Sequence, residues 1–477
     1  MAHGLTAEEA GLFKAYDVRG AAPAPLSPAL AWRVGRAFAT WLGGGRIGMA
    51  RDARLTSPAL ARAFAAGLQM PGVEILDYGM LPTDAMWFAV RRDGLDGGAV
   101  ITASHNPPGD NGIKLVERDA APVFHENGLP EVRRLAGEFS DPPIDFPPGP
   151  PPSTMDRPPL EIASDYRAFL NSVVSFRSLP ALRVVLDAGN GMGGLMAAEV
   201  FSRVPGQFLA VQFRPDGSFP NRGANPLDPE NRQPLVRRVL EEGADFGVLW
   251  DGDADRCVFV DDQGFHIPGD FATALLATAE ITKEPGARIV FDLRSSRAVP
   301  DTVTQAGGIP CAGRVGHAYL KRRMRQEDAR FGGELSGHFF FRAAGYADNA
   351  LLPILLMIER IRDSGRSLSS LASELRRRYF TVDEESRVVP DQAMAFDMVR
   401  EAFPGGKVNR LDGLTMDFSD WRFTLRPSNT EPVMRLTLEA YRAGLAERRR
   451  DELLSLLDEA RERAAASPTS PEGAFAE

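Results

Sequence analysis

The sequence predicts an α/β protein of three similar domains followed by a C-terminal α+β domain. Its 477 residues are enough for about three or four domains of ordinary size. A pattern of short strand, polar loop and helix occurs three times before residue 375, and strands alternating with helices are typical of α/β units. After residue 375 strand-like segments dominate, which indicates a different, fourth domain.

The three similar units begin at 45–68, 182–201 and 287–308, each with a strand, a polar loop and a helix. Each unit closes on an apolar strand that runs into a second polar loop; these closing segments are 98–107, 243–256 and 328–341. Open α/β sheets bind ligands at the carboxyl ends of their strands, so we expect these closing loops to carry the chemistry.

The fourth domain is predicted from strands at 380–389, 414–428 and 433–441 and from a helix over about 444–464. In that helix the apolar positions recur at helical spacing: Leu453, Leu457, Ala460 and Ala464. The clearest seam is 141–160, where nine of twenty residues are proline and an extended linker is expected. The predicted domains are 1–150, 151–258, 259–372 and 373–477.

Composition excludes several classes of protein. A net charge of −9 argues against nucleic-acid binding, and no segment approaches the roughly 18 apolar residues of a membrane span. Only two cysteines are present, Cys257 and Cys311, and the first twenty residues lack the pattern of a secretory signal. We therefore expect a cytoplasmic protein that does not bind membranes or nucleic acid.

The segment 101–114, "ITASHNPPGDNGIK", ends a strand on Ser104 and His105 and reaches Lys114 through a loop rich in proline and glycine. Taken alone, a turn-capping or helix-capping role is the commoner explanation for such a serine. The functional alternative is a nucleophile. Because no Ser-His-Asp order or G-x-S-x-G motif surrounds it, carriage of a phosphoryl group fits better than acyl transfer.

The segment "DGDADR" places Asp251, Asp253 and Asp255 in a tight loop after an apolar strand. Oxygen ligands of this kind suit Mg²⁺. An EF-hand is excluded, since its positions 6 and 12 would hold Arg256 and Asp262. A solvated acidic turn is an equally good interpretation of this loop alone.

Two further loops carry polar clusters. "RPSNTEPVMR", 426–435, has an arginine at each end of a hydroxyl-rich turn, which favours phosphate binding over a surface turn with an ion pair. "GGELSGH", 332–338, gathers Glu334, Ser336 and His338 and suits a polyhydroxylated ligand, although an ordinary loop is the commoner explanation for this segment taken alone.

A rival function comes from "AGNGMGG", 188–194, which contains the G-x-G-x-x-G pattern of dinucleotide-binding proteins directly after a strand. This would indicate an NAD-dependent enzyme. It leaves Ser104 and the other loops unexplained, so tight packing of a helix on the strand is the preferred interpretation.

Taken together, "FKAYDVRG" (13–20), "TASHNP" with "NGIK", "DGDADR", "GELSGH" and "RPSNTEP" closely resemble the α-D-phosphohexomutase superfamily, in particular its phosphomannomutase/phosphoglucomutase group. The resemblance covers essentially the whole chain. It implies mixed sheets in the three α/β domains and four domains around a central active-site cleft. It also implies an isomerase that interconverts hexose 1-phosphate and hexose 6-phosphate through a phosphoserine and a hexose 1,6-bisphosphate.

The resemblance assigns roles to individual residues. Ser104 is implied to be the phosphoserine, and Mg²⁺ is implied to bind Asp251, Asp253, Asp255 and an oxygen on Ser104. The other residues at the reacting end are Arg19, His105, Lys114 and Arg256, with Lys114 as general acid and base. The implied substrate-binding residues are Tyr16, Arg294, His317, Glu334, Ser336, His338, Arg426, Ser428, Asn429, Thr430 and Arg435.

The implied partners are small hexose phosphates, with glucose 1,6-bisphosphate or another hexose bisphosphate as activator, and the chain is expected to be a monomer or weak homodimer. Arg294, Arg314 and Val315 depart from the residues common in the family, which leaves mannose and glucose phosphates both open as substrates. Phosphoglucosamine mutase is a less favoured alternative, because such enzymes tend to have glutamine in the 332–338 loop. A non-catalytic sugar-phosphate-binding protein would be expected to lack Ser104 or an aspartate of the metal loop.

Overall fold

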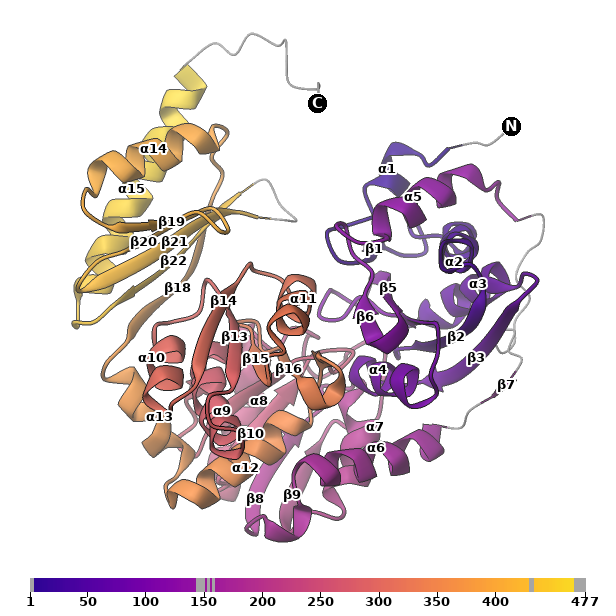
Figure 1. The fold of residues 1–477 in the computed structure, drawn as a ribbon, viewed down its shortest axis with the longest axis horizontal. Coiled ribbons are helices and arrows are strands. Elements are labelled where there is room, and N and C mark those ends of the chain that lie inside the picture. Colours follow the sequence, from indigo (N-terminus) through magenta and orange to yellow (C-terminus); the bar gives the residue numbers. More distant parts are fainter. Residues whose placement is uncertain (1–3, 143–150, 152–154, 157–158, 429–432, 467–477) are drawn as a thin grey trace.

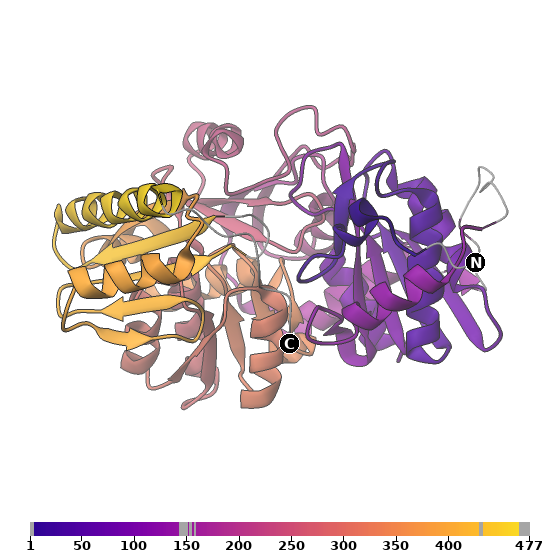
Figure 2. The same cartoon turned by 90° about the horizontal axis from the view of Figure 1, so that it is seen from above.

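The computed structural model describes residues 4–142, 151, 155–156, 159–428 and 433–466, and these form four domains in chain order. Figure 1 shows them along an arc, with the first and the fourth domain at its two ends. Seen from above in Figure 2, the fourth domain again lies at one end and the first at the other. Among the described helices, none has both the length and the apolar character that a membrane crossing needs.

The first domain contains a mixed sheet in the order β1-β5-β4-β2-β3-β7, with β6 paired to β5. Its strands are β1 (Val18–Ala21), β2 (Gly45–Arg51), β3 (Val73–Met80), β4 (Gly97–Ile101), β5 (Asp110–Glu117), β6 (Ala121–Pro122) and β7 (Met155–Asp156). Its helices are α1 (Ala7–Ala10), α2 (Pro28–Leu42), α3 (Ser57–Leu68), α4 (Thr83–Arg92) and α5 (Leu129–Glu138).

The second and third domains have five-stranded sheets in the orders β12-β11-β10-β8-β9 and β14-β13-β15-β16-β17. The second domain consists of α6 (Pro159–Val173), β8 (Leu182–Asp187), α7 (Gly193–Phe201), β9 (Gly206–Val211), α8 (Pro229–Glu242), β10 (Phe246–Trp250), β11 (Cys257–Asp261) and β12 (His266–Ile267). The third consists of α9 (Gly269–Lys283), β13 (Arg288–Asp292), α10 (Ala298–Gln305), β14 (Ile309–Gly313), α11 (His317–Glu327), β15 (Phe331–Gly333), β16 (Phe339–Phe341), β17 (Ala347–Asp348), α12 (Leu352–Ser364) and α13 (Leu368–Arg376).

The three α/β domains share one topology. In each, a first strand (β2, β8 or β13) pairs in parallel with the next two strands, and the third strand continues into an antiparallel fourth. The turn between the third and fourth strands is therefore the same topological position three times: β4–β5, β10–β11 and β15–β16. The predicted repetition of three mixed α/β units is confirmed.

The fourth domain is an antiparallel sheet in the order β18-β22-β21-β20-β19. Its elements are β18 (Phe380–Arg387), α14 (Gln392–Ala402), β19 (Lys407–Asn409), β20 (Leu414–Asp417), β21 (Trp421–Pro427), β22 (Met434–Ala440) and α15 (Leu445–Ala466). Alternation along β21 turns Trp421, Phe423 and Leu425 into the core that packs on α14 and α15. Arg422 and Thr424 face the opposite side, where they bond to carbonyls of the third domain.

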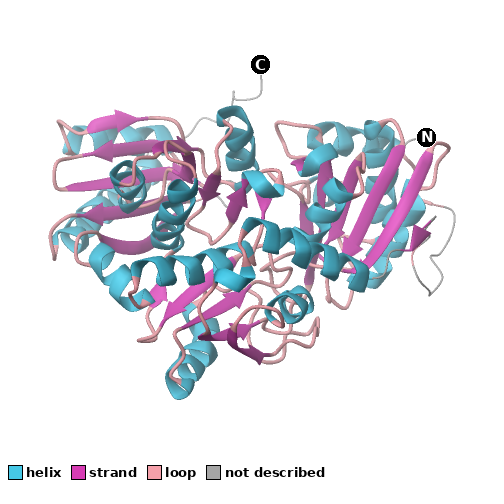
Figure 3. Cartoon of the chain, turned by 60° about the horizontal axis from the view of Figure 1, so that its bottom comes forward, coloured by secondary structure: helices cyan, strands magenta, loops and turns pink. Residues whose placement is uncertain are grey.

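Local sequence explains where several elements begin and end. Ser27 caps α2 ahead of Pro28, and Asp228 caps α8 ahead of Pro229, so that proline takes the first helical position, which needs no backbone donor. Both helices end at a glycine in the left-handed conformation. The run "FGVLW" of β10 is wholly buried, as expected for a strand covered on both faces; Figure 3 shows helices packed against the sheets.

Two boundaries differ from the sequence-based expectation. Helix α6 begins at Pro159, inside the segment expected to be a linker, because proline is tolerated in a first helical turn. The second sheet continues past residue 258, since β11 forms a hairpin with β10 and β12 extends it to Ile267. We therefore propose that the third domain begins after residue 267.

The apolar cores explain how the domains are held. One continuous cluster runs from Ala50 in the first domain to Tyr379 at the end of the third, so these three domains share buried surface. The fourth domain has its own cluster, from Val389 to Ala460. Many of its described contacts with the third domain are polar, such as Arg422 with the Ser295 and Leu293 carbonyls and Glu439 with the Arg297 amide.

The glycine-rich segment 188–194 packs against the protein's own atoms. A Cβ on Gly191 would lie 2.6 Å from the Gly252 carbonyl oxygen, and one on Gly194 would lie 2.6 Å from the Phe213 carbonyl oxygen. Gly189 has φ +53° and lies against the Arg222 guanidinium. These contacts explain why glycine stands at these positions, and binding of a dinucleotide is not needed to explain them.

We expect Gly194→Ala to lower the unfolding temperature, since overpacking against backbone costs about 1–3 kcal/mol. Gly137→Ala is the matched control, because a Cβ on that helical glycine has its nearest neighbours at 3.6 Å. Differential scanning calorimetry of both variants checks this. Equal unfolding temperatures for the two would contradict the packing explanation.

Candidate active site

Ser104 lies in the β4–β5 turn, with only 1% of its surface exposed. Its φ of +54° is rare for a residue with a side chain and indicates that the surrounding structure holds the turn in place. The Ser104 amide donates to Thr102 Oγ1, and Ser104 Oγ donates to Asp251 Oδ2 at 2.7 Å. His105 Nδ1 is 3.2 Å from the same hydroxyl oxygen.

Arg54, which no sequence motif indicated, binds the backbone of the turn that carries Ser104. Its guanidinium is fully buried, lies 3.1 Å from Asp52 and donates to four backbone carbonyls of the turn at 2.6–2.9 Å. Those carbonyls belong to Ser104, Asn106, Pro107 and Asp110. A single arginine in a loop after a strand carries no sequence signal for this role, which depends on contacts about fifty residues away.

The β10–β11 turn brings Asp251, Asp253 and Asp255 together, each buried, with one oxygen from each within 4.8 Å of the others. Lys114 on β5 donates to Asp253 Oδ2 at 2.7 Å and to Asp255 Oδ2 at 2.5 Å. Thr83 Oγ1 donates to Asp253 Oδ2 at 2.6 Å. The second domain's carboxylates are thus bound to residues of the first domain.

The three aspartates have different electrostatic surroundings. Burial, together with the neighbouring Asp255 and Asp253, raises the pKa of Asp251. Burial also opposes ionisation of Asp255, but Lys114 and His338 outweigh it and hold the pKa of Asp255 well below its usual range. Asp253 Oδ1 is buried without a hydrogen-bond partner. An all-oxygen donor set that includes this buried oxygen fits a hard divalent cation such as Mg²⁺.

Two arginines line the same cleft as Ser104. Arg19 pairs with Asp17 and donates to Asn106 Oδ1 at 3.1 Å, while Arg256 Nε lies 3.7 Å from Asp251 Oδ2. Burial, with Arg256 and Arg19 nearby, lowers the pKa of His105 well below its ordinary value. His105 is therefore neutral at pH 7, and the arginines supply the positive charge here.

The β15–β16 turn carries Glu334, Ser336 and His338. His338 Nδ1 is 2.8 Å from Ser336 Oγ and 3.1 Å from Glu334 Oε2, while its Nε2 is 3.3 Å from Asp255 Oδ1. Although burial opposes the charged form, Asp255 and Glu334 raise the pKa of His338 to about 9. A charged His338 thus links the turn of the third domain to the carboxylates of the second.

Two aromatic residues, Tyr16 and His317, and an arginine, Arg294, lie beside the β15–β16 turn. The His317 ring lies 5.5 Å from that of His338 and 5.0 Å from that of Tyr16. Gly316, at φ +124°, leaves room for the Tyr16 hydroxyl, which a Cβ there would meet at 2.0 Å. Arg294 Nη2 lies 3.2 Å from Glu334 Oε1 and 3.1 Å from Asp292 Oδ2.

In the fourth domain, Arg426 and Arg435 stand directly opposite each other on β21 and β22. Burial, with Arg294 nearby, lowers the pKa of Arg426. Two like charges across a strand pair repel, so this arrangement favours an anion between or beside them. Of the residues predicted for this turn, Ser428 lies in the cleft, whereas Asn429 and Thr430 lie outside the described residues.

Residues of all four domains line one cleft of about 750 Å³. The predicted residues that line it are Tyr16, Arg19, Ser104, His105, Lys114, Arg256, Arg294, His317, Glu334, Ser336, His338, Arg426, Ser428 and Arg435. The three aspartates are not among the lining residues, but they form hydrogen bonds with Ser104 and Lys114, which are. The cleft also contains residues that the sequence analysis did not single out, among them Asp17, Asn225 and Glu384.

Arg314 and Val315, which depart from the family's usual residues, have different surroundings. Arg314 lies over the Tyr319 ring and pairs with Glu126 of the first domain, and only Val315 reaches the cleft. Of these two departures, Val315 alone is positioned to affect substrate preference.

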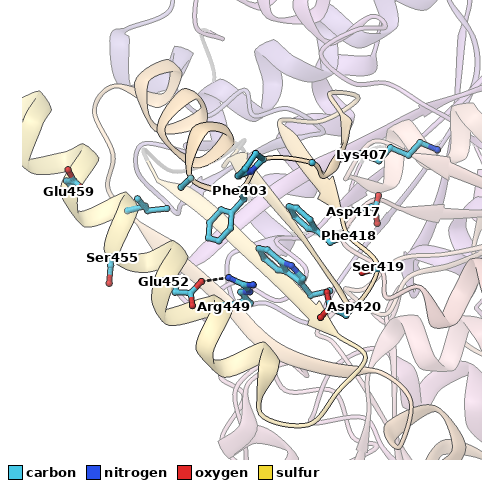
Figure 4. Close-up of a pocket in the computed structure, with 15 residues that line it drawn as sticks. Phe403, Lys407, Asp417, Phe418, Ser419, Asp420, Arg449, Glu452, Ser455 and Glu459 are labelled. Atoms are coloured by element: carbon cyan, nitrogen blue, oxygen red, sulfur yellow. Dashed lines mark hydrogen bonds and ion pairs between the residues drawn. The ribbon is translucent and has the colours of Figure 1, made fainter.

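A second hollow, of about 1020 Å³, lies in the fourth domain between α15 and the β20–β21 turn (Figure 4). Phe403 and Phe418 line it, and Arg449 pairs there with Glu452 at 2.6 Å. None of the described residues predicted for the site lies in it, so the interdomain cleft is the candidate active site.

Comparison with known proteins gives a consistent result. Sequence profiles described as phosphoglucomutase/phosphomannomutase match the chain in four parts: α/β/α domain I at 10–133, domain II at 165–264, domain III at 268–379 and the C-terminal domain at 383–456.

Individual relatives match over nearly the full length. A phosphomannomutase of Salmonella montevideo is 40% identical and covers 94% of this chain and 98% of its own. A phosphohexose mutase of Xanthomonas campestris is 39% identical, with coverage of 93% and 98%. The crystal structure of a phosphoglucomutase/phosphomannomutase family protein from Burkholderia thailandensis superimposes with a TM-score of 0.82 at 30% identity, covering 94% of this chain and 98% of that one. The chain therefore belongs to the phosphoglucomutase/phosphomannomutase family, whose members are hexose phosphate mutases of the isomerase class.

Proposed function

We propose that this protein interconverts hexose 1-phosphates and hexose 6-phosphates of mannose, glucose or both, with Ser104 as the phosphoryl carrier. One observation carries the proposal: Ser104 Oγ lies 2.7 Å from Asp251 Oδ2, and Ser104 lines the same cleft as Arg426 and Arg435 of the fourth domain. One end of the cleft is suited to transfer a phosphoryl group and the other to hold a phosphate.

In the proposed reaction, phosphorylated Ser104 gives its phosphoryl group to the free hydroxyl of the bound hexose phosphate. A bond forms between the sugar oxygen and phosphorus, and the Ser104 Oγ–phosphorus bond breaks. The Lys114 ammonium gives a proton to the departing Ser104 Oγ and takes one back from the sugar hydroxyl, so that it acts as both acid and base within the step. The hexose 1,6-bisphosphate then turns over, and its other phosphoryl group returns to Ser104. Arg19 and Arg256 hold the negative charge of the group in transfer.

The family is Mg²⁺-dependent, and the buried aspartates of the β10–β11 turn could bind a metal. We propose Asp251, Asp253, Asp255 and an oxygen on Ser104 as its ligands; the ion would supply charge neutralisation to the transferring phosphoryl group. A hexose bisphosphate, such as glucose 1,6-bisphosphate, is the proposed activator, because it can rephosphorylate an empty Ser104.

The sugar and the second phosphate have separate proposed sites. Glu334 and Ser336, with His338, bind sugar hydroxyls, and Tyr16, Arg294 and His317 complete this wall. Arg426, Ser428 and Arg435 bind the phosphate that is not reacting, together with Asn429 and Thr430 of the same turn. Because this site contacts only phosphate, it accepts a 1-phosphate and a 6-phosphate alike, as a reaction with two binding orientations requires.

The decisive assay compares glucose 1-phosphate, mannose 1-phosphate and glucosamine 1-phosphate as substrates, each with and without a trace of the matching bisphosphate. Conversion of the first two supports the proposal, and a preference for glucosamine 1-phosphate would favour the phosphoglucosamine mutase alternative. We further propose a cytoplasmic location, supported by two buried thiols without a disulfide, and a monomer or weak homodimer in solution.

Ser104→Ala is expected to lower the activity by more than about a thousandfold, because the variant lacks the nucleophile. Wild type incubated with glucose 1,6-bisphosphate should gain the mass of one phosphoryl group, mapped to the peptide with Ser104. Ser172→Ala, an exposed serine on α6, is the control. An active Ser104→Ala variant, or phosphate found on another residue, would contradict the assignment.

Asp253→Asn is expected to weaken Mg²⁺ binding by roughly tenfold or more, because a neutral amide is a poor ligand for a hard cation. Calorimetric titration of Mg²⁺ into wild type, this variant and Asp397→Asn, an exposed control, measures the effect. Activity of the wild type should disappear with chelator and return with Mg²⁺. An enzyme that stays active after complete metal removal would contradict this prediction.

Arg426→Ala is expected to raise KM for glucose 1-phosphate and mannose 1-phosphate by similar factors, about ten- to a hundredfold, since a hydrogen bond to a charged group contributes about 1.5–3 kcal/mol. Steady-state kinetics on both sugars measure this, with circular dichroism to establish folding. Arg442→Ala, an exposed arginine of the same domain, is the control. A change confined to one sugar would show that Arg426 contacts the hexose instead of the phosphate.

A further inference from the structure

Glu384 places a carboxylate in the part of the cleft that we assign to phosphate. It lies on β18, the strand by which the chain passes from α13 into the fourth domain (Figure 1). The register of β18 against β22 shifts between Val382 and Glu385, so Glu384 falls within a bulge instead of the regular ladder. A bulge re-aims side chains, and here Glu384 is among the residues that line the cleft.

The Glu384 carboxylate lies between arginines of two domains. Its Oε1 is 3.1 Å from Arg435 Nη1 on β22, and its Oε2 is 3.7 Å from Arg294 Nη1, in the loop that follows β13 of the third domain. The side chain is 23% exposed, and its Oε2 is buried without a hydrogen-bond partner. One oxygen is thus well bound while the other is held only by longer-range attraction.

Glu384 lies where several arginines come close together. Arg426 and Arg435 are direct cross-strand neighbours, and Arg426 is also close enough to Arg294 to be affected by its charge. Arg294 is already paired with Asp292 and Glu334, whereas Arg426 and Arg435 repel each other across the strand pair, partly shielded from water. Glu384 attracts each of them, and a bound phosphate would do the same with more charge and more acceptor oxygens.

We propose that Glu384 is an internal substitute for the non-reacting phosphate: its carboxylate neutralises the arginines of the empty site, and an incoming phosphate displaces it. This inference rests on the proposed function, because it takes Arg426 and Arg435 as the phosphate site. Glu384 therefore lowers the affinity of the site for phosphate. It also balances the charge of the arginines while the bisphosphate turns over. During that step the phosphate group leaves the arginines, but the bisphosphate stays bound to the enzyme.

The direct test is calorimetric titration of inorganic phosphate into the full-length protein without added Mg²⁺. Glu384→Gln keeps the shape of the side chain and removes its charge, and it is expected to tighten phosphate binding by about three- to tenfold, as removal of one partly buried ion-pair partner allows. Glu385→Gln is the matched control, because Glu385 is the adjacent residue of β18 and pairs with Arg387. Its phosphate affinity should equal that of wild type.

Kinetics give a second measurement. KM for glucose 1-phosphate and mannose 1-phosphate should fall in Glu384→Gln by the same factor as the phosphate dissociation constant. Glu384→Ala should show the same direction, and circular dichroism establishes that both variants are folded. A residue with only a structural role would weaken binding when changed, so equal or weaker phosphate affinity in folded variants overturns the inference.

The result for Arg426→Ala separates this inference from the proposed function. If that variant loses phosphate affinity while Glu384→Gln gains none, the phosphate site is correctly assigned and the role of Glu384 is wrong. If Arg426→Ala binds phosphate like wild type, the phosphate-site assignment itself fails, and the inference about Glu384 fails with it.

Discussion

The contact of Lys114 with Asp253 and Asp255 is the interaction on which the rest of the site depends. Three buried carboxylates in one turn repel each other, and the ammonium group on β5 offsets part of that repulsion from the neighbouring domain. The same turn accepts the hydroxyl of Ser104 through Asp251. Holding the carboxylates together therefore also fixes the position of the serine.

This constraint extends across domain boundaries. Thr83 of the first domain donates to Asp253, His338 of the third domain lies beside Asp255, and the apolar core runs continuously through all three domains. These contacts and the close packing of the shared core hold the three turns against one another. The three domains share one topology, so the turns that carry Ser104, the three aspartates and Glu334 each join the third and fourth strands of one domain.

The fourth domain is attached differently, with its own core and many polar contacts to the third. Polar interfaces of this kind are compatible with relative motion of domains. A site that must hold a phosphate in two orientations and release it between them benefits from such a boundary. The ion pair of Glu384 with Arg294 crosses this boundary, which is why we consider it a part of the binding cycle and not only of the fold.

The sequence by itself determined the fold class and the three-fold repetition, and most residues that it predicted for the site line the candidate cleft. Apolar strands that stop at polar turns are a local pattern, and "TASHNP", "DGDADR", "GELSGH" and "RPSNTEP" are each contained within a few residues. Local patterns of this kind predict which residues carry chemistry even when their partners are hundreds of residues away.

Only the tertiary structure decided how these residues meet. Arg54 binds four carbonyls about fifty residues distant, and Glu384 reaches the cleft through a strand bulge; neither contact leaves a periodic signal in the sequence. The extent of the second sheet likewise depended on the β10–β11 hairpin. The physical reason is common to all three: the energy of these contacts comes from burial and from charges brought together by folding, and neither exists until distant segments have packed.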